Sequence, residues 1–177
     1  GQVSTMVLVP EVVDAVAPVP VLAAGGIARG RQIAAALALG AEGVWCGSVW
    51  LTTEEAETLP VLKDKFLAAT SSDTVRSRSL TGKPARMLRT AWTDEWERPG
   101  SPAPLGMPLQ SALIGDPQIR INRAAAQPDA KARELATYFV GQVVGSLNKV
   151  QPTGSVVLEM VSEFIDAVER LNGLVDR

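Results

Sequence analysis

The stretch that decides the fold is residues 18–50, PVPVLAAGGIARGRQIAAALALGAEGVWCGSVW. Its two short apolar runs, residues 19–24 and 43–46, have the composition of strands buried on both faces, which is typical of parallel sheets. Between them, residues 29–39 carry apolar side chains at spacings of three and four and end at Gly40, a pattern that predicts a helix with a C-terminal glycine. The stretch therefore predicts a strand, a helix and a parallel strand within about thirty residues, the length of a βαβ unit.

Each of the two predicted strands ends in a glycine turn, Gly25-Gly26 after the first and Gly47-Ser48 after the second. Glycine lets backbone N–H groups approach an anion without an intervening Cβ, and the N-terminus of the following helix adds a favourable dipole. In barrels of eight βα units, the phosphate site is formed after strands seven and eight. The pair of turns predicts a phosphate site of this kind, and the alternative is two tight turns that bind nothing.

Residues 22–56, LAAGGIARGRQIAAALALGAEGVWCGSVWLTTEEA, closely resemble the phosphate-binding end of FMN-dependent nitronate monooxygenases, formerly called 2-nitropropane dioxygenases. The wider relatives include FMN-dependent enoyl reductases of fatty-acid synthesis, which share the Gly-Gly-Ile turn. At the second turn the family often has Gly-Thr-Arg-Phe, where this chain has Gly-Ser-Val-Trp. Serine keeps the hydroxyl that a phosphate contact needs. Because the Arg-Phe pair is absent, the resemblance does not identify the subfamily or its substrate. The resemblance implies FMN as the cofactor, no metal, and a cofactor-binding set made of Ala24, Gly25, Gly26, Gly47 and Ser48.

The family's proposed catalytic base is a His in a Gly-Gly-His-Gly loop beside the flavin. This chain contains no His, and the resemblance aligns Gly1 with the last glycine of that loop. It therefore implies that no catalytic residue lies in this chain and that the base is a His just upstream of Gly1. A family segment that approaches the flavin from outside the barrel is similar to the region of Tyr138 and Gln142, which we expect at the edge of the active site.

The chain has 177 residues, whereas a complete TIM (β/α)8 barrel typically takes roughly 250. We therefore expect an α/β fold that is the C-terminal part of such a barrel. Residues 1–52 would be its last βα units, and residues 53–177 a mainly helical extension packed on the barrel. The expected partners are the N-terminal half of the barrel, in the same polypeptide or a separate chain, a small nitronate and dioxygen. A homo-oligomer is compatible with the sequence.

Composition narrows the classes of function. The formal net charge of −2 provides no electrostatic footprint for nucleic acid. A single cysteine, Cys46, excludes an intrachain disulfide framework, and its place in a predicted strand suggests a small buried hydrophobe. No apolar run reaches the length of a membrane span, and the N-terminal residues show no signal-peptide pattern. We expect a soluble, cytoplasmic protein without nucleic-acid or membrane partners.

Outside the βαβ unit, apolar spacing and proline positions predict further helices. The expected ranges are residues 10–17, with Pro10 in the first turn, residues 53–69, divided at Pro60, and residues 130–147 and 155–175.

Two segments are predicted to be less regular. Residues 71–86 carry three arginines and a lysine, Arg76, Arg78, Lys83 and Arg86, which suit either an anion site or a solvated surface strand or loop. Residues 90–115 hold Trp92 and Trp96 and a Pro/Gly cluster, and we expect an irregular excursion whose tryptophans either edge a pocket or anchor the segment.

Three functions fit these observations. The first is FMN-dependent oxidation of nitronates or nitroalkanes with dioxygen, with this chain supplying the phosphate site. The second is an FMN-dependent, NAD(P)H-using enoyl reductase, which shares the phosphate clamp. The third is a non-catalytic phosphate-binding fragment.

Overall fold

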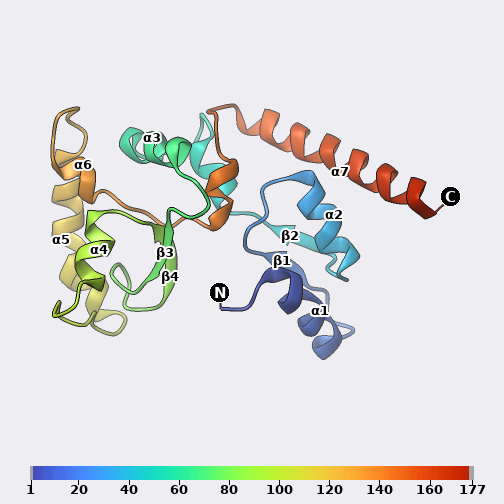
Figure 1. The fold of residues 1–177 in the computed structure, drawn as a ribbon, viewed down its shortest axis with the longest axis horizontal. Helices are drawn as coiled ribbons and strands as arrows, with labels where there is room; N and C mark the ends of the chain where they lie inside the picture. Colours follow the sequence, from blue (N-terminus) through green and yellow to red (C-terminus); the bar gives the residue numbers. More distant parts are fainter. Residues whose placement is uncertain (1, 176–177) are drawn as a thin grey trace. The chain divides into compact units, whose positions relative to one another are not determined.

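The computed structural model describes residues 2–175 and has an α/β fold that divides into two compact units (Figure 1). Unit 1 comprises Gly1–Ala56 and Lys149–Arg177, and unit 2 comprises Glu57–Asn148. This grouping differs from a single division after residue 52, because the last helix of the chain returns to the unit that holds the predicted βα motif. Gly1, aligned above with the end of the His loop, lies outside the described residues.

The predicted βαβ motif is present in unit 1. β1 (Leu22–Ala24), α2 (Gly30–Ala38) and β2 (Gly43–Trp45) follow in order, and β1 pairs in parallel with β2. β1 is shorter than the predicted strand because two prolines, which cannot donate a ladder hydrogen bond, precede it. One face of the pair packs with α1 (Thr5–Val16) and α2 around a core that includes the buried residues Val9, Ala23, Ile27, Ala36 and Ala41.

The other face of the β1–β2 pair is open to solvent. Side chains alternate along a strand, and the partner register places Leu22, Ala24 and Trp45 on the side away from the buried Ala23. The side chains of Leu22 and Trp45 are 56% and 71% exposed. A parallel strand normally has both faces covered, so this face lacks the cover that such a pair requires.

Two helical predictions in unit 1 change. The first helix begins at Thr5, so Pro10 lies inside it and costs one intrahelical hydrogen bond, whereas residues 10–17 were expected with Pro10 at the start. The predicted helical start at Thr53 is also wrong. A 3-10 turn, η1 (Ser48–Thr52), is followed by extended chain in which Thr53 bridges to Gln151. The helix predicted over residues 155–175 is confirmed as α7 (Thr153–Val175), which packs against α2.

Unit 2 contains α3 (Pro60–Ala68) and an antiparallel hairpin of β3 (Thr74–Ser77) and β4 (Ala85–Leu88). It continues through α4 (Ala91–Glu97), α5 (Leu109–Ala124), α6 (Ala132–Leu135) and the 3-10 turn η2 (Gln142–Ser146). Pro60 begins a helix, so the second of the two short helices predicted over residues 53–69 is present and the first is not. A core cluster around Leu80, Met87 and Ile114 takes in both Trp92 and Trp96, so the tryptophans anchor this segment.

The helix predicted over residues 130–147 is wrong. Only the four residues of α6 are α-helical there, and the chain then runs extended beside β4 before the 3-10 turn η2, with Leu88 N–H donating to the Tyr138 carbonyl at 3.0 Å. Tyr138, Phe139 and Val140 have strand-forming side chains, and the free edge of the hairpin gives them a partner that sequence spacing does not reveal.

The excursion predicted over residues 90–115 is more regular than expected, since α4 and the start of α5 lie in it. Helix propensity does not predict α5, because it contains Gly115 and Pro117 and both residue types disfavour a helix interior. No helix within residues 2–175 combines the length and apolar character needed to cross a membrane.

Candidate phosphate-binding site

The turn after β1 has a backbone that suits glycine. Gly25 and Gly26 have φ angles of +102° and +76°, in the left-handed region that other residues rarely adopt. Both are exposed, and a Cβ built on Gly26 would meet no atom within 4 Å. The backbone conformation therefore accounts for glycine at this position, and the open space above Gly26 leaves room for a ligand to lie against the backbone.

The turn is held by its carbonyl oxygens. The Thr5 hydroxyl donates to the Gly25 carbonyl at 2.9 Å, and the Gln32 amide donates to the Gly26 carbonyl at 2.7 Å. Within residues 2–175, and outside the helices and strands, Gly26 N–H donates to no protein acceptor. The Gly26 N–H thus remains available to an anion, and the carbonyls of both glycines are occupied.

The turn after β2 contains Gly47, which is exposed and has open space where a Cβ would be. The Cys46 carbonyl accepts a hydrogen bond from the Trp50 indole at 2.7 Å, and the Gly47 carbonyl accepts one from Trp50 N–H at 3.1 Å. Ser48 is half-buried and begins η1. Cys46 packs against the unit 1 core as expected, and burial raises the pKa of its thiol.

The two turns lie at the same edge of the sheet. β1 and β2 are parallel and adjacent, and Ala24 is the register partner of Trp45. The next residues on each strand are Gly25 and Cys46, so the structure brings the two turns side by side, as predicted. Ala24 is exposed and lies at the end of β1 on the open face of the pair.

The backbone N–H groups of Ala28, Arg29 and Gly30, at the N-terminus of α2, are occupied by the protein itself. Gln32 Oε1 accepts hydrogen bonds from the N–H groups of Ala28 and Arg29, at 2.8 and 3.0 Å. Glu163 of α7 accepts one from Gly30 N–H at 2.8 Å. A carboxylate at a helix N-terminus is stabilised by the helix dipole, and here it comes from α7.

Two arginines flank this carboxylate. Arg29 binds both Glu163 oxygens, with its Nε and Nη2 at 3.0 and 2.8 Å, and Arg31 Nε donates to Oε1 at 2.7 Å. The hydrogen bond from Arg29 is the main reason that the pKa of Glu163 falls from 4.5 to about 2, and the same contact raises the pKa of Arg29. The cluster therefore holds two positive charges and one negative charge near the turn after β1.

Tyr138 and Gln142 do not share the helix that was predicted over residues 130–147. Tyr138 lies on the extended chain beside β4 and is 46% exposed, and Gln142 begins η2. Both belong to unit 2, and their place at the edge of an active site stays a prediction.

The arginine-rich segment forms the β3–β4 hairpin, as the surface-strand alternative predicted. Arg78 donates to the Gly82 carbonyl at 2.8 Å and Arg86 to the Thr74 hydroxyl at 3.1 Å. These two arginines serve the hairpin itself, which argues against the anion site that their spacing suggested.

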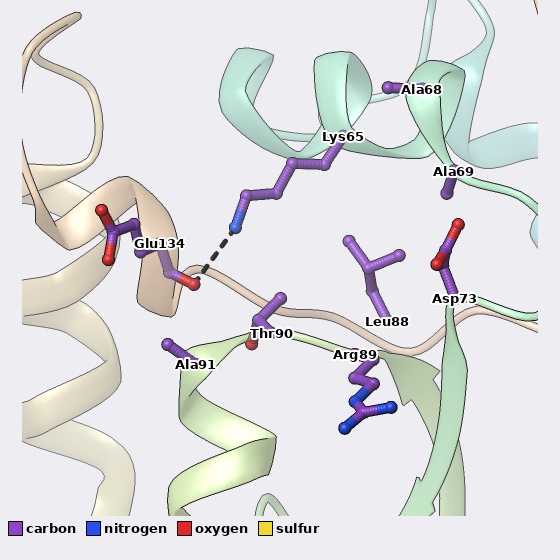
Figure 2. Close-up of a pocket in the computed structure, with 9 residues that line it drawn as sticks. All are labelled: Lys65, Ala68, Ala69, Asp73, Leu88, Arg89, Thr90, Ala91 and Glu134. Atoms are coloured by element: carbon purple, nitrogen blue, oxygen red, sulfur yellow. Dashed lines mark hydrogen bonds between the residues drawn. The ribbon is translucent and has the colours of Figure 1, made fainter.

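Unit 2 also has a hollow of about 490 Å³, lined by residues of α3, β4, α4 and α6 and of the loops around them (Figure 2). Lys65 points into it, but its ammonium donates to the Ala136 carbonyl at 2.8 Å and to the Glu134 carbonyl at 3.5 Å. Burial lowers the pKa of Lys65, and Arg133 lowers it further. Because Lys65 caps the C-terminal end of α6, we assign it a structural role.

Sequence reasoning missed Thr5 and Gln32, which bond the turn after β1, and Glu163, which bonds the start of α2. Gln32 follows the N-cap by three positions, the spacing of a capping box, and this local signal was available. Thr5 and Glu163 lie 20 and 134 residues from their partners, and no local pattern reveals such contacts.

Comparison with known proteins identifies the group to which these turns belong. The family model of nitronate monooxygenase matches residues 1–163. Rv1533 of Mycobacterium tuberculosis, a protein assigned as a monooxygenase, is 84% identical over all 177 residues, which are 47% of its own length. A Staphylococcus aureus (strain MSSA476) protein assigned as a nitronate monooxygenase is 30% identical over 158 residues, 84% of this chain and 44% of its own.

Two solved structures extend the comparison. FabK from Thermotoga maritima has a TM-score of 0.76 and 36% identity, over 98% of this chain and 53% of its own. Nitroalkane oxidase from Streptomyces ansochromogenes has a TM-score of 0.79 and 30% identity, over 96% of this chain and 46% of its own. The chain spans about half the length of each of these relatives, and over that span it belongs to the nitronate monooxygenase family.

Proposed function

We propose that the complete protein containing this chain oxidises nitronates with dioxygen using FMN, and that this chain supplies the phosphate site of the flavin. One observation carries the proposal: two glycine turns lie side by side at the carboxyl ends of parallel strands. Outside the helices and strands of the described chain, Gly26 N–H has no protein acceptor, and no atom fills the space above Gly26.

The chemistry of these donors fits a phosphate. N–H groups of Gly25, Gly26 and Gly47 would bind the phosphate oxygens, with the Ser48 hydroxyl as a further donor and Ala24 beside the flavin ring. When bound, FMN would supply the redox chemistry, accepting electrons from the nitronate and passing them to dioxygen. The part of this chain is then to bind and orient the cofactor.

We further propose that β1 and β2 are among the last strands of a TIM barrel. The exposed face with Leu22 and Trp45 supports this, because the remaining strands and their side chains would cover it. In this proposal the base is a His outside the chain, just before Gly1, and Tyr138 and Gln142 lie at the edge of the active site. The remaining half of the protein is the partner that completes the site.

An FMN-dependent, NAD(P)H-using enoyl reductase is the second candidate. The observation that supports this candidate is the likeness to FabK. Its sequence identity to this chain, 36%, exceeds the 30% of nitroalkane oxidase, and the two TM-scores are similar. The phosphate turns serve either function, so they do not separate the two.

The test is carried out on the full-length protein. We expect it to be purified yellow, with the absorbance of bound FMN, and to consume dioxygen when a nitronate is added. Under anaerobic conditions the nitronate should bleach the flavin and NADPH should not. Bleaching by NADPH alone would favour the reductase, and a colourless protein that binds no added FMN would contradict both enzymatic functions.

A further inference from the structure

The phosphate turn is braced from three helices, and the brace from α7 has no counterpart in the local sequence. Thr5 of α1 and Gln32 of α2 hold the carbonyls of Gly25 and Gly26. Gln32 also accepts from Arg29 N–H, so the turn and the first residue before α2 are fixed by one amide group. What holds that point in place is Glu163, which binds the Arg29 side chain and Gly30 N–H.

Glu163 is placed there by a close helix crossing. A Cβ built on Gly30 would overlap backbone atoms of Met160, Glu163 and Phe164, so the backbone of α7 lies directly against the start of α2. Gly30 is buried and the Glu163 side chain is only 18% exposed. The carboxylate therefore sits at a short, defined distance from the α2 N-terminus and from the chain that leads into it.

Resting on the proposed function, we propose that Glu163 is a positioning residue for the flavin phosphate. It touches neither turn. It fixes Arg29 and Gly30, and through the Gln32 bridge it holds the Gly25-Gly26 N–H groups in the geometry that receives the phosphate. A glycine pair has wide conformational freedom, so a brace of this kind lowers the entropy lost when the ligand binds.

If Glu163 acted only through its charge, its effect on FMN affinity would be the opposite. A carboxylate near a phosphate dianion repels it, so a Glu163 that acted only as a charge would weaken FMN binding, and its neutralisation would strengthen it. A residue needed only for folding would affect flavin binding whether or not the flavin carries a phosphate. The two flavins FMN and riboflavin, which differ by the phosphate, therefore separate the three roles.

The experiment measures the dissociation constants of FMN and riboflavin for the full-length apoprotein and its Glu163→Gln variant. We expect FMN binding to weaken by about tenfold, which corresponds to about 1.4 kcal/mol, and riboflavin binding to change by less than about twofold. Glu169→Gln is the matched control. It removes the same charge from the same helix, at a carboxylate that pairs with no residue among 2–175, and should leave both constants unchanged.

Each other outcome overturns the inference. Equal weakening of FMN and riboflavin binding would show that Glu163 has only a structural role. Tighter or unchanged FMN binding would show that it acts only as a nearby charge or not at all. If Glu163→Gln does not fold, Glu163→Asp retains the charge but shortens the reach, and its loss of affinity must also be specific to FMN. A wild-type protein that binds neither flavin contradicts the proposed function itself.

Discussion

Gly26 combines a left-handed backbone with open space above it. A substitution there should therefore have two separate effects, one on FMN affinity and one on stability. Gly26→Val should weaken FMN binding by at least about tenfold, roughly 1.4 kcal/mol, because the side chain enters the space proposed for the phosphate. It should also cost about 1–3 kcal/mol of stability through backbone strain at a φ of +76°. Equilibrium titration of the apoprotein with FMN measures the first effect and urea unfolding the second.

Gly100 provides the control for strain alone. It has a φ of +89°, is exposed and has no atom within 4 Å of its built Cβ, but it lies in unit 2. Gly100→Val should lose comparable stability and keep its FMN affinity. If both variants lose affinity equally, the turn after β1 is not a phosphate site.

Ser48 tests the second turn. Loss of one charge-assisted hydrogen bond typically costs roughly 1.5–3 kcal/mol, so Ser48→Ala should release FMN on dilution. Ser48→Thr keeps a hydroxyl and should retain the cofactor. Fluorescence of released flavin after dilution distinguishes them, and identical behaviour of the two variants would exclude the hydroxyl as a ligand.

At the scale of elements, the contact of α2 with α7 depends on the absence of a side chain at Gly30. Gly30→Ala should destabilise the full-length protein by about 1–3 kcal/mol, because the methyl group meets α7 backbone that has no alternative rotamer. Gly173→Ala is the matched control within α7, since its built Cβ meets nothing within 4 Å. There the same change should be neutral or stabilising by about 0.5–1 kcal/mol. The urea unfolding midpoints of the two variants measure the difference, and equal changes in stability for Gly30→Ala and Gly173→Ala would disprove the close crossing.

The Glu163 carboxylate makes this helix contact sensitive to pH. Its pKa is about 2 in the folded chain and ordinarily 4.5, so folding favours the ionised form. The stability it contributes is complete above about pH 4.5 and is lost as the pH falls toward 2. The wild-type protein and Glu163→Gln should therefore differ most in free energy of unfolding near pH 6 and converge at low pH. Urea titrations over that range measure the difference, and a constant gap would count against the shifted pKa.

Elements whose signals are local were predictable from the sequence. The βαβ motif, the glycine turns and α7 follow from apolar spacing and from glycine positions, and the structure confirms them within about two residues at most boundaries. The extended chain at Tyr138 was misread because its partner, β4, lies some fifty residues earlier. The brace at Glu163 was missed for the same reason, since long-range hydrogen bonds leave no periodic trace.

At the scale of the whole molecule, the 177-residue chain exposes surface that the proposed barrel would bury. Leu22 and Trp45 face solvent, and a two-stranded parallel sheet is marginal without neighbours. We expect the chain expressed alone to aggregate or fold poorly, to be colourless, and to oxidise no nitronate. Coexpression with the remaining half should restore a soluble yellow complex.

Trp45 reports on this assembly directly. In the complex its indole should pass from water to an apolar environment, which shifts its fluorescence to shorter wavelength. Comparison with a Trp45→Phe variant identifies the part of the fluorescence change that comes from Trp45 rather than from the other three of the four tryptophans. A soluble monomer of the 177-residue chain that binds FMN and turns over nitronate by itself would refute both the barrel and the placement of the base.

Unit 1 is built from two separated stretches of chain, Gly1–Ala56 and Lys149–Arg177. On the ribosome, the phosphate turn is therefore made early and Glu163 late, with more than a hundred residues translated between them. A product that terminates in unit 2 carries both glycine turns but no α7. If α7 braces the turn as proposed, such a truncated product holds flavin poorly, and cofactor retention becomes a property of finished chains.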